Sequence, residues 1–213
     1  EMSMRKPAEA RAALTATGDQ LARLLQVIEA EILPKTGLGV AKGDKVFGAA
    51  VLSPSLETVI ADTNHETDSP LFHGEVYVLQ HWAAKTPAGA RGESAANAVF
   101  LSTHEPCCMC ISSIVWAGFK TVYYLFPYLT TSKQGIPHDL DIMHELWDVP
   151  SYQKQNKFCS TACIIDLIDA LMEGAQKTVL LASVARISAR YDELSGKYHA
   201  EKAANPENSL AFN

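Results

Sequence analysis

The sequence predicts an α/β fold, a central sheet with helices on both sides in three layers. Two observations support this class. Segments with apolar residues at strand spacing alternate with segments at helical spacing, and an apolar fraction of 47% is ample for a buried core. A length of 213 residues suits one domain better than two independent cores. We therefore expect a single compact unit over residues 1–213.

The first part of the chain predicts a helix, a pair of strands and a second helix. Apolar residues at every third or fourth position predict an amphipathic helix from Asp19 to Leu33, ending before Pro34. Val46–Leu52 and Glu57–Ala61 are short β-prone runs joined by a turn, so they predict two adjacent strands. Helical spacing returns at His73–Ala84.

The middle of the chain predicts a strand, a helix and another strand. The segments are Val99–Ser102, Cys107–Ala117 and Thr121–Phe126. Because strands alternate with helices, we expect a largely three-layer α/β arrangement. Together with the preceding elements, they define a core domain of about residues 17–128.

Beyond this core we expect an insertion at about 129–160 and a helical extension at about 164–204. The insertion contains an apolar patch, Ile142–Trp147, that predicts one short helix. Long irregular segments of this kind are often lids or binding loops. Trp147 is the candidate for a lid contact because it lies in this insertion. Ile164–Ile168 fits either a fifth strand or the start of a helix. Lys177–His199 predicts a helix, and the tail Asn205–Asn213 shows no period.

The charge balance favours a small-molecule partner. The net charge is −6 and the pI is near 5.6. The sequence also lacks the clustered Lys/Arg stripe with which a nucleic-acid-binding protein neutralises phosphates. No apolar run approaches the roughly 20 residues that span a bilayer, and no signal-peptide pattern opens the chain. We expect a cytoplasmic protein that binds neither membrane nor nucleic acid.

The cysteine pattern indicates a metal site. Three of five cysteines, Cys107, Cys108 and Cys110, lie within four positions, which suits metal binding better than a disulfide framework. Cys107 and Cys110 share one side of a first helical turn, where amide donors favour the thiolate. With His73 as a third ligand, one tetrahedral position of Zn²⁺ stays open for water, as catalytic zinc requires.

Glu75 completes a catalytic arrangement with these ligands. Two thiolates and an imidazole leave the zinc complex formally neutral, so its water needs a nearby base. At a helix start, Glu75 can lean toward that water while His73 binds the metal. We expect Glu75 to take a proton from the water and then return protons to a ring nitrogen and a leaving amine.

From about Val46 to Tyr124, the chain resembles the cytidine deaminase-like superfamily. Two signatures carry the resemblance, His73-Gly74-Glu75 and Pro106-Cys107-Cys108-Met109-Cys110. The longer segment Ser102-Thr103-His104-Glu105-Pro106-Cys107-Cys108-Met109-Cys110 is most similar to the tRNA adenosine deaminase and guanine deaminase branch. The resemblance implies a mixed five-stranded sheet with its fifth strand parallel to the fourth, Zn²⁺ as the only cofactor, and a homodimer.

The resemblance also implies substrate contacts. It matches Asn64 to an asparagine that hydrogen-bonds the substrate and places Phe47 near a pocket where a base would stack. His104 and Glu105, which precede the cysteine motif, are further candidate substrate contacts. The expected reaction is hydrolytic deamination of a free nucleobase, nucleoside or related amino-heterocycle, with release of ammonia.

Two alternatives stay open from the sequence. A nucleic-acid deaminase would need a basic rim beside the pocket. A zinc-stabilised binding module would need a fourth protein ligand, for which His104 or Cys108 is available, and would not need Glu75. The neighbouring polar residues His65, Glu66 and Asp68 are expected to form a solvated loop, with substrate contact as the alternative.

Overall fold

The computed structural model describes residues 10–136 and 138–204, without the side chains of 203 and 204, and contains one five-stranded sheet. Strand order across the sheet is β2-β1-β3-β4-β5. β1 runs antiparallel to β2 and β3, whereas β3, β4 and β5 are mutually parallel. The strands are β1 (Gly48–Leu52), β2 (Thr58–Thr63), β3 (Val99–His104), β4 (Thr121–Phe126) and β5 (Ser160–Cys163).

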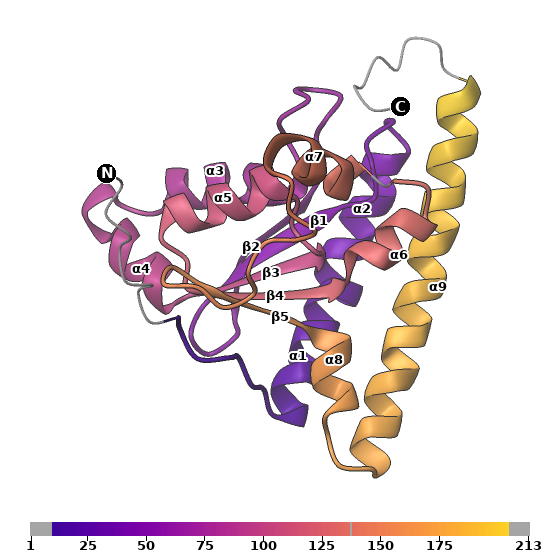
Figure 1. Cartoon of the computed structure of the whole chain (residues 1–213). Coiled ribbons are helices and arrows are strands. Elements are labelled where there is room, and N and C mark those ends of the chain that lie inside the picture. Colours follow the sequence, from indigo (N-terminus) through magenta and orange to yellow (C-terminus); the bar gives the residue numbers. More distant parts are fainter. Residues whose placement is uncertain (1–9, 137, 205–213) are drawn as a thin grey trace.

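Helices cover both faces of this sheet (Figure 1). One face carries α3 (Gly74–Lys85), α4 (Arg91–Asn97) and α5 (Cys108–Ala117). The other carries α1 (Gly18–Val27), the π-helical turn η1 (Ile28–Ile32), α2 (Leu33–Val40), α8 (Ile164–Asp169) and the long α9 (Ala175–Ala204). The remaining helices are the short 3₁₀ turn η2 (Ala88–Ala90), α6 (Tyr128–Lys133) and α7 (His138–Trp147).

The predicted α/β class with a mixed five-stranded sheet is confirmed. Successive strand residues point to opposite faces, so Ala49 and Val51 of β1 pack against the α3 side and Ala50 and Leu52 against the α1 side. Both faces are buried, as expected for a sheet covered by helices.

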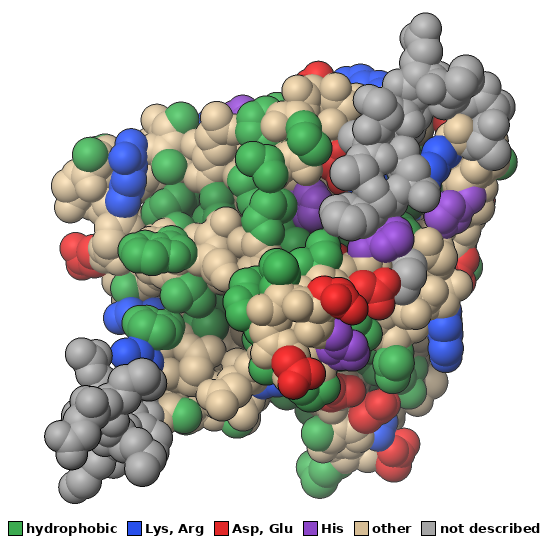
Figure 2. All heavy atoms as spheres, turned by 45° about the horizontal axis from the view of Figure 1, so that its top comes forward, with side chains coloured by type: hydrophobic (Ala, Val, Ile, Leu, Met, Phe, Trp, Pro, Cys, Tyr) green, Lys and Arg blue, Asp and Glu red, His purple; other side chains and the backbone are tan. Residues whose placement is uncertain are grey.

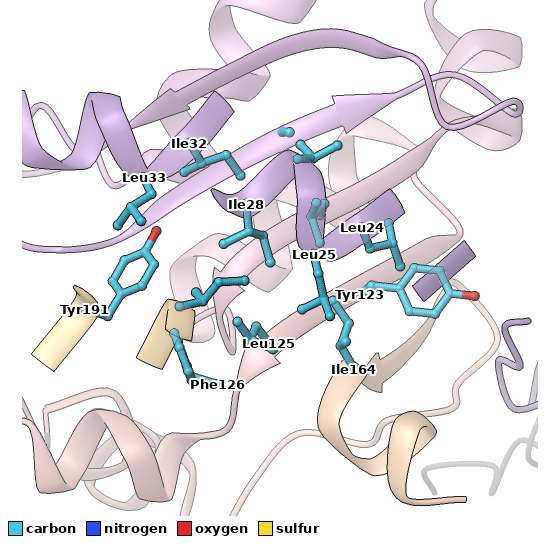
Figure 3. Packing of buried hydrophobic residues seen from close by; sticks show 14 of the residues in the cluster. Leu24, Leu25, Ile28, Ile32, Leu33, Tyr123, Leu125, Phe126, Ile164 and Tyr191 are labelled. Carbon is cyan, nitrogen blue, oxygen red and sulfur yellow. The ribbon is translucent and has the colours of Figure 1, made fainter. Parts of the chain in front are cut away.

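The hydrophobic core between the sheet and α1 is shown in Figure 3. Thr17 caps α1 in a capping box with Gln20, which contributes about 1 kcal/mol. Leu21, Leu24 and Leu25 are almost fully buried, and each contributes roughly 1.5–3 kcal/mol. Burial of this face, more than the cap, therefore holds α1 against the sheet.

The prediction that the first helix ends before Pro34 is wrong. The chain instead passes through η1 and begins α2 at Leu33, with Pro34 in the first turn of that helix. A proline is tolerated there because the first-turn amide has no intrahelical partner to lose. The π-helical turn supplies the break in register.

The C-terminal part differs from the sequence prediction in two places. Residues 164–168 are helical, in α8, and the fifth strand lies just before them as β5, parallel to β4 as the resemblance implied. The segment after Tyr128 holds two helices, α6 and α7, instead of one. The tail Asn205–Asn213 lies outside the described residues. The division into core, insertion and extension stays a prediction.

Of the helices in the described part of the chain, none combines the length and hydrophobicity of a membrane span.

Candidate active site

His73 and Glu75 are placed by the start of α3. His73 is the N-cap of α3 with extended backbone, and Glu75 lies in the first turn. Between them, Gly74 lies so close to β1 that an added Cβ would be 2.8 Å from the Cα of Gly48. A larger residue would push α3 away from the sheet. The side-chain oxygen of Asn64 accepts a hydrogen bond from the Gly74 amide at 2.5 Å, which fixes this helix end further.

Cys107 and Cys110 come from the start of α5, after β3. Cys107 is the N-cap and Cys110 lies in the first turn. The three candidate ligand atoms of His73, Cys107 and Cys110 lie within 4.8 Å of one another. Nδ1 of His73 is 3.6 Å from the Sγ of Cys107 and 3.6 Å from that of Cys110. The predicted ligands thus meet although 34 to 37 residues separate the histidine from the cysteines.

These separations fit a tetrahedral zinc ion. Zn–S and Zn–N bonds of about 2.3 and 2.05 Å at a tetrahedral angle place sulfur and nitrogen roughly 3.6 Å apart. Both nitrogen-to-sulfur distances equal this edge at 3.6 Å. A neutral imidazole and two thiolates are also the donor types that zinc prefers. The site therefore fits Zn²⁺, with His73, Cys107 and Cys110 as its protein ligands.

The protonation of the three ligands reflects their mutual contact. Burial alone would lower the pKa of His73, but the hydrogen bond and negative charge of Cys107, with the charges of Glu66 and Glu75, raise it to about 9. Hydrogen bonding from Cys110 and the contact with His73 hold the pKa of Cys107 well below its usual value. Burial, then Cys107, raises the pKa of Cys110. Without metal, these contacts therefore favour a protonated His73 beside a Cys107 thiolate and a Cys110 thiol.

Glu75 is buried beside this group and is held by β3. Ser102 Oγ donates a hydrogen bond to Glu75 Oε1 at 2.9 Å. Burial, followed by the negative charge of Cys107, raises the pKa of Glu75 above its ordinary value. A carboxyl with a raised pKa next to a metal-binding group accepts a proton more readily than an exposed carboxylate does, as a general base requires.

A cavity of about 270 Å³ opens next to His73 and Cys107. Its wall is mainly apolar, with Lys45, Glu66 and Asp139 among the polar groups. The lining residues are Lys45, Phe47, Glu66, Pro70, Leu71, His73, Cys107, Cys108, Met109, Ile136, His138, Asp139 and Ile142. Burial first, then the charge of Cys107, raises the pKa of Asp139 to about 8. α7 supplies one wall, so the segment expected to form a lid does contribute to the cavity.

The face of the molecule that carries α3, α5 and α7 is partly hydrophobic (Figure 2). Large exposed side chains of these helices include Trp116 of α5, 91% exposed, and Trp147 at the end of α7, 55% exposed. Trp147, the candidate lid contact, therefore lies largely in solvent, and Ile142 of the same helix lines the cavity.

The four predicted substrate contacts occupy different environments. Phe47 lines the cavity, with its ring 4.8 Å from that of His104. Asn64 is fully buried, and its amide donates to Glu66 at 2.6 Å while accepting from Gly74. Both polar atoms of the Asn64 side chain therefore already have protein partners.

His104 and Glu105 are likewise engaged by the protein. The ring nitrogens of His104 contact Thr103 at 3.0 Å and Gln134 at 3.2 Å, and burial lowers its pKa to about 3, so the ring is neutral. Glu105 accepts hydrogen bonds from the Tyr128 amide and from Lys154. These contacts tie β3 to the segment that follows β4. Substrate contact by Asn64, His104 or Glu105 stays a prediction.

Sequence reasoning missed Lys45 and Asp139 as polar residues of the cavity, and it named Glu66 only as an alternative substrate contact. The expectation that Glu66 belongs to a solvated loop is wrong, because it is 4% exposed and pairs with Lys45 at 2.9 Å. The two partners are 21 positions apart, and no spacing rule links such residues. Asp139 lies in the insertion, where the only sequence signal was an apolar patch.

Comparisons with known proteins agree with the site. Residues 32–126 match the family model described as the cytidine and deoxycytidylate deaminase zinc-binding region. A comparison with curated proteins finds no match.

The chain is also similar to several solved structures. One is a guanine deaminase from Nitrosomonas europaea, 16% identical over 85% of this chain and 88% of that chain, with a TM-score of 0.47. Another is a guanine deaminase from Bacillus subtilis, 22% identical over 57% and 79%, with a TM-score of 0.45. A tRNA:A34 deaminase is 14% identical over 73% and 94%, with a TM-score of 0.42. Similarities at this level do not identify a substrate.

Proposed function

We propose, from the match of residues 32–126 to the model of the cytidine and deoxycytidylate deaminase zinc-binding region, that the chain is a zinc-dependent hydrolytic deaminase of a free nucleobase, nucleoside or related amino-heterocycle. One observation carries the proposal. His73, Cys107 and Cys110 have the spacing of zinc ligands, and the buried carboxyl of Glu75 lies beside them.

The reaction requires two proton transfers. The oxygen of water bonds to the ring carbon that bears the exocyclic amine, the carbon–nitrogen bond breaks, and a carbonyl group and ammonia remain. Zinc, when bound, supplies Lewis-acid activation of the water. Glu75 accepts a proton from the water and passes it to the ring nitrogen, then moves a second proton from the new hydroxyl to the leaving amine.

The surroundings of Glu75 suit this double role. Burial and the negative charge of Cys107 raise its pKa, and His73 and the Ser102 hydrogen bond oppose that rise, so Glu75 accepts a proton more readily than an exposed carboxylate does. The bond from Ser102 Oγ occupies Oε1, at 2.9 Å, and orients the carboxyl. The second oxygen is the one we assign to proton transfer.

The cavity supports a neutral heterocycle over a phosphorylated substrate. Among its described lining residues, Lys45 is the single Lys or Arg, and it is paired with Glu66. Asp139 adds another carboxyl to the wall. A phosphate group would meet acidic groups there without a free cation of the kind that usually binds it. The apolar remainder of the wall, including Phe47, suits the faces of an aromatic ring.

The experiment is an ammonia-release assay of the zinc-loaded protein across aminated bases, nucleosides, nucleotides and an RNA hairpin. The proposal expects release from a free heterocycle that is lost in Glu75→Gln. Release from RNA alone would favour a nucleic-acid deaminase instead. Equal release by the wild type and Glu75→Gln would contradict the mechanism. The homodimer stays a prediction, to be measured by sedimentation.

A further inference from the structure

A buried ion pair, Lys45 with Glu66, lies next to His73 of the candidate metal site. Lys45 Nζ lies 2.9 Å from Glu66 Oε1, and the side chains are 9% and 3% exposed. Burying two charges is unfavourable, and hydrogen bonds to their remaining donors and acceptors offset that cost. Here the other oxygen of Glu66 accepts from Asn64 Nδ2 at 2.6 Å. Both carboxylate oxygens are thus held in place by residues from different segments of the chain.

Glu66 also faces His73. Its Oε1 lies 3.5 Å from Nε2 of His73, whereas Nδ1 of the same ring points to the two cysteine sulfurs, at 3.6 Å from each. The two ring nitrogens therefore have partners on opposite sides. In protein metal sites, the ligating histidine generally donates its second N–H to a carboxylate, carbonyl or water, which fixes the tautomer and the ring orientation.

We infer that Glu66, held by Lys45 and Asn64, is a positioning residue that accepts the Nε2 proton of His73 and thereby presents Nδ1 to zinc. The inference rests on the zinc site of the proposed function and adds a residue from outside the two sequence signatures. Lys45 neutralises the charge of Glu66 in this arrangement. Because the pair is neutral overall, Glu66 adds no net charge behind a metal site whose ligands already balance the charge of the ion.

Asn64 links the same arrangement to α3. Its Oδ1 accepts from the Gly74 amide at 2.5 Å and its Nδ2 donates to Glu66. Because Gly74 follows His73 directly, one amide side chain ties the backbone beside the histidine to the carboxylate that faces its ring. The orientation of the His73 ring and the position of the backbone at Gly74 are thus linked through Asn64 and Glu66.

The first test is zinc affinity of the full-length protein, measured by competition with a chromophoric chelator. Three donors, from Lys45, Asn64 and His73, face the carboxylate of Glu66. Glu66→Gln replaces one of the two acceptor oxygens with a donating amide nitrogen. We expect the dissociation constant for zinc to rise about 10- to 100-fold. Asp68→Asn is the matched control, since it removes a carboxylate from the same loop with a 68% exposed side chain. Its zinc affinity should equal that of the wild type.

The second test needs no substitution. Long-range ¹H–¹⁵N spectra of zinc-loaded, ¹⁵N-histidine-labelled wild type should show His73 ligated through Nδ1 with a proton on Nε2 that exchanges slowly with water. That proton should exchange faster in Glu66→Gln. Melting of the zinc-free variants checks that each is folded. Ligation through Nε2, or slow exchange unchanged in Glu66→Gln, would overturn the inference.

The outcomes separate this inference from the proposed function. Unchanged zinc affinity in Glu66→Gln, with a deaminating wild type, would overturn the role of Glu66 and leave the function standing. Lost turnover with unchanged zinc affinity would make Glu66 a substrate contact, which also overturns it. A wild type that binds no zinc would instead remove the proposed function itself.

Discussion

The strands and helices before Pro127 and the segments after it contribute differently to the site. Residues 32–126 match a family model and supply the candidate zinc ligands and Glu75. The later segments lie outside that match, yet α7 brings His138, Asp139 and Ile142 to the cavity wall. We expect the first region to determine the reaction and the second to contribute, with the first, to which molecule fits the cavity.

The largest expected effect is on turnover, from Glu75→Gln. The amide keeps the size of the side chain but cannot accept a proton, so we expect turnover to fall about 10²- to 10⁴-fold while zinc stays bound. Steady-state kinetics with metal analysis measures both quantities. Glu93→Gln, an exposed residue of α4, is the control. Activity retained in Glu75→Gln would refute the assignment of the reaction to the first region.

The second largest effect is expected from removal of a zinc ligand. We expect Cys110→Ala to lose stoichiometric zinc and to melt at a lower temperature than the zinc-loaded wild type, because metal binding stabilises the folded state. Cys108→Ala is the matched control, since it changes a neighbouring thiol and should retain zinc. Zinc loss in Cys108→Ala would indicate a fourth protein ligand and favour the non-catalytic alternative.

Zinc affinity should rise with pH. In the zinc-free site the pKa of His73 is raised to about 9 and that of Cys110 is raised too, so both hold protons near neutral pH that zinc must displace. Affinity therefore increases from pH 6.5 toward 9. Chelator competition at several pH values, with calorimetry in two buffers, counts the protons released. A pH-independent affinity would contradict this protonation pattern.

A smaller effect is expected from the second region, on selectivity. With a pKa raised to about 8 by burial and by Cys107, the Asp139 carboxyl is largely protonated at neutral pH and can donate a hydrogen bond into the cavity. Asp139→Asn should shift relative kcat/KM among active substrates by roughly 10-fold, the value of one hydrogen bond. Zinc content should not change.

Asp141→Asn is the control for that experiment, because Asp141 is exposed on the same helix. An unaltered substrate order in Asp139→Asn would mean that α7 only encloses the cavity. The division of roles between the two regions would then fail.

The sequence by itself indicated the candidate zinc ligands and Glu75, because each of the two motifs depends on a short spacing, whereas the meeting of the motifs across 34 to 37 residues depends on the fold. Cys107 and Cys110 at i, i+3 face one way on any helix start, and His73 with Glu75 form a similarly local pair. The strands β1 to β4 were predictable for the same reason, since hydrophobic alternation is local.

Only the tertiary structure decided what surrounds that chemistry. Lys45 and Glu66 pair across 21 residues, and Asp139 reaches the cavity because α7 lies over it. Pro34 was misjudged because a proline that ends one helix can equally begin another, and the choice depends on packing against the sheet. Contacts between distant segments are fixed by burial and charge compensation in three dimensions, which no local period encodes.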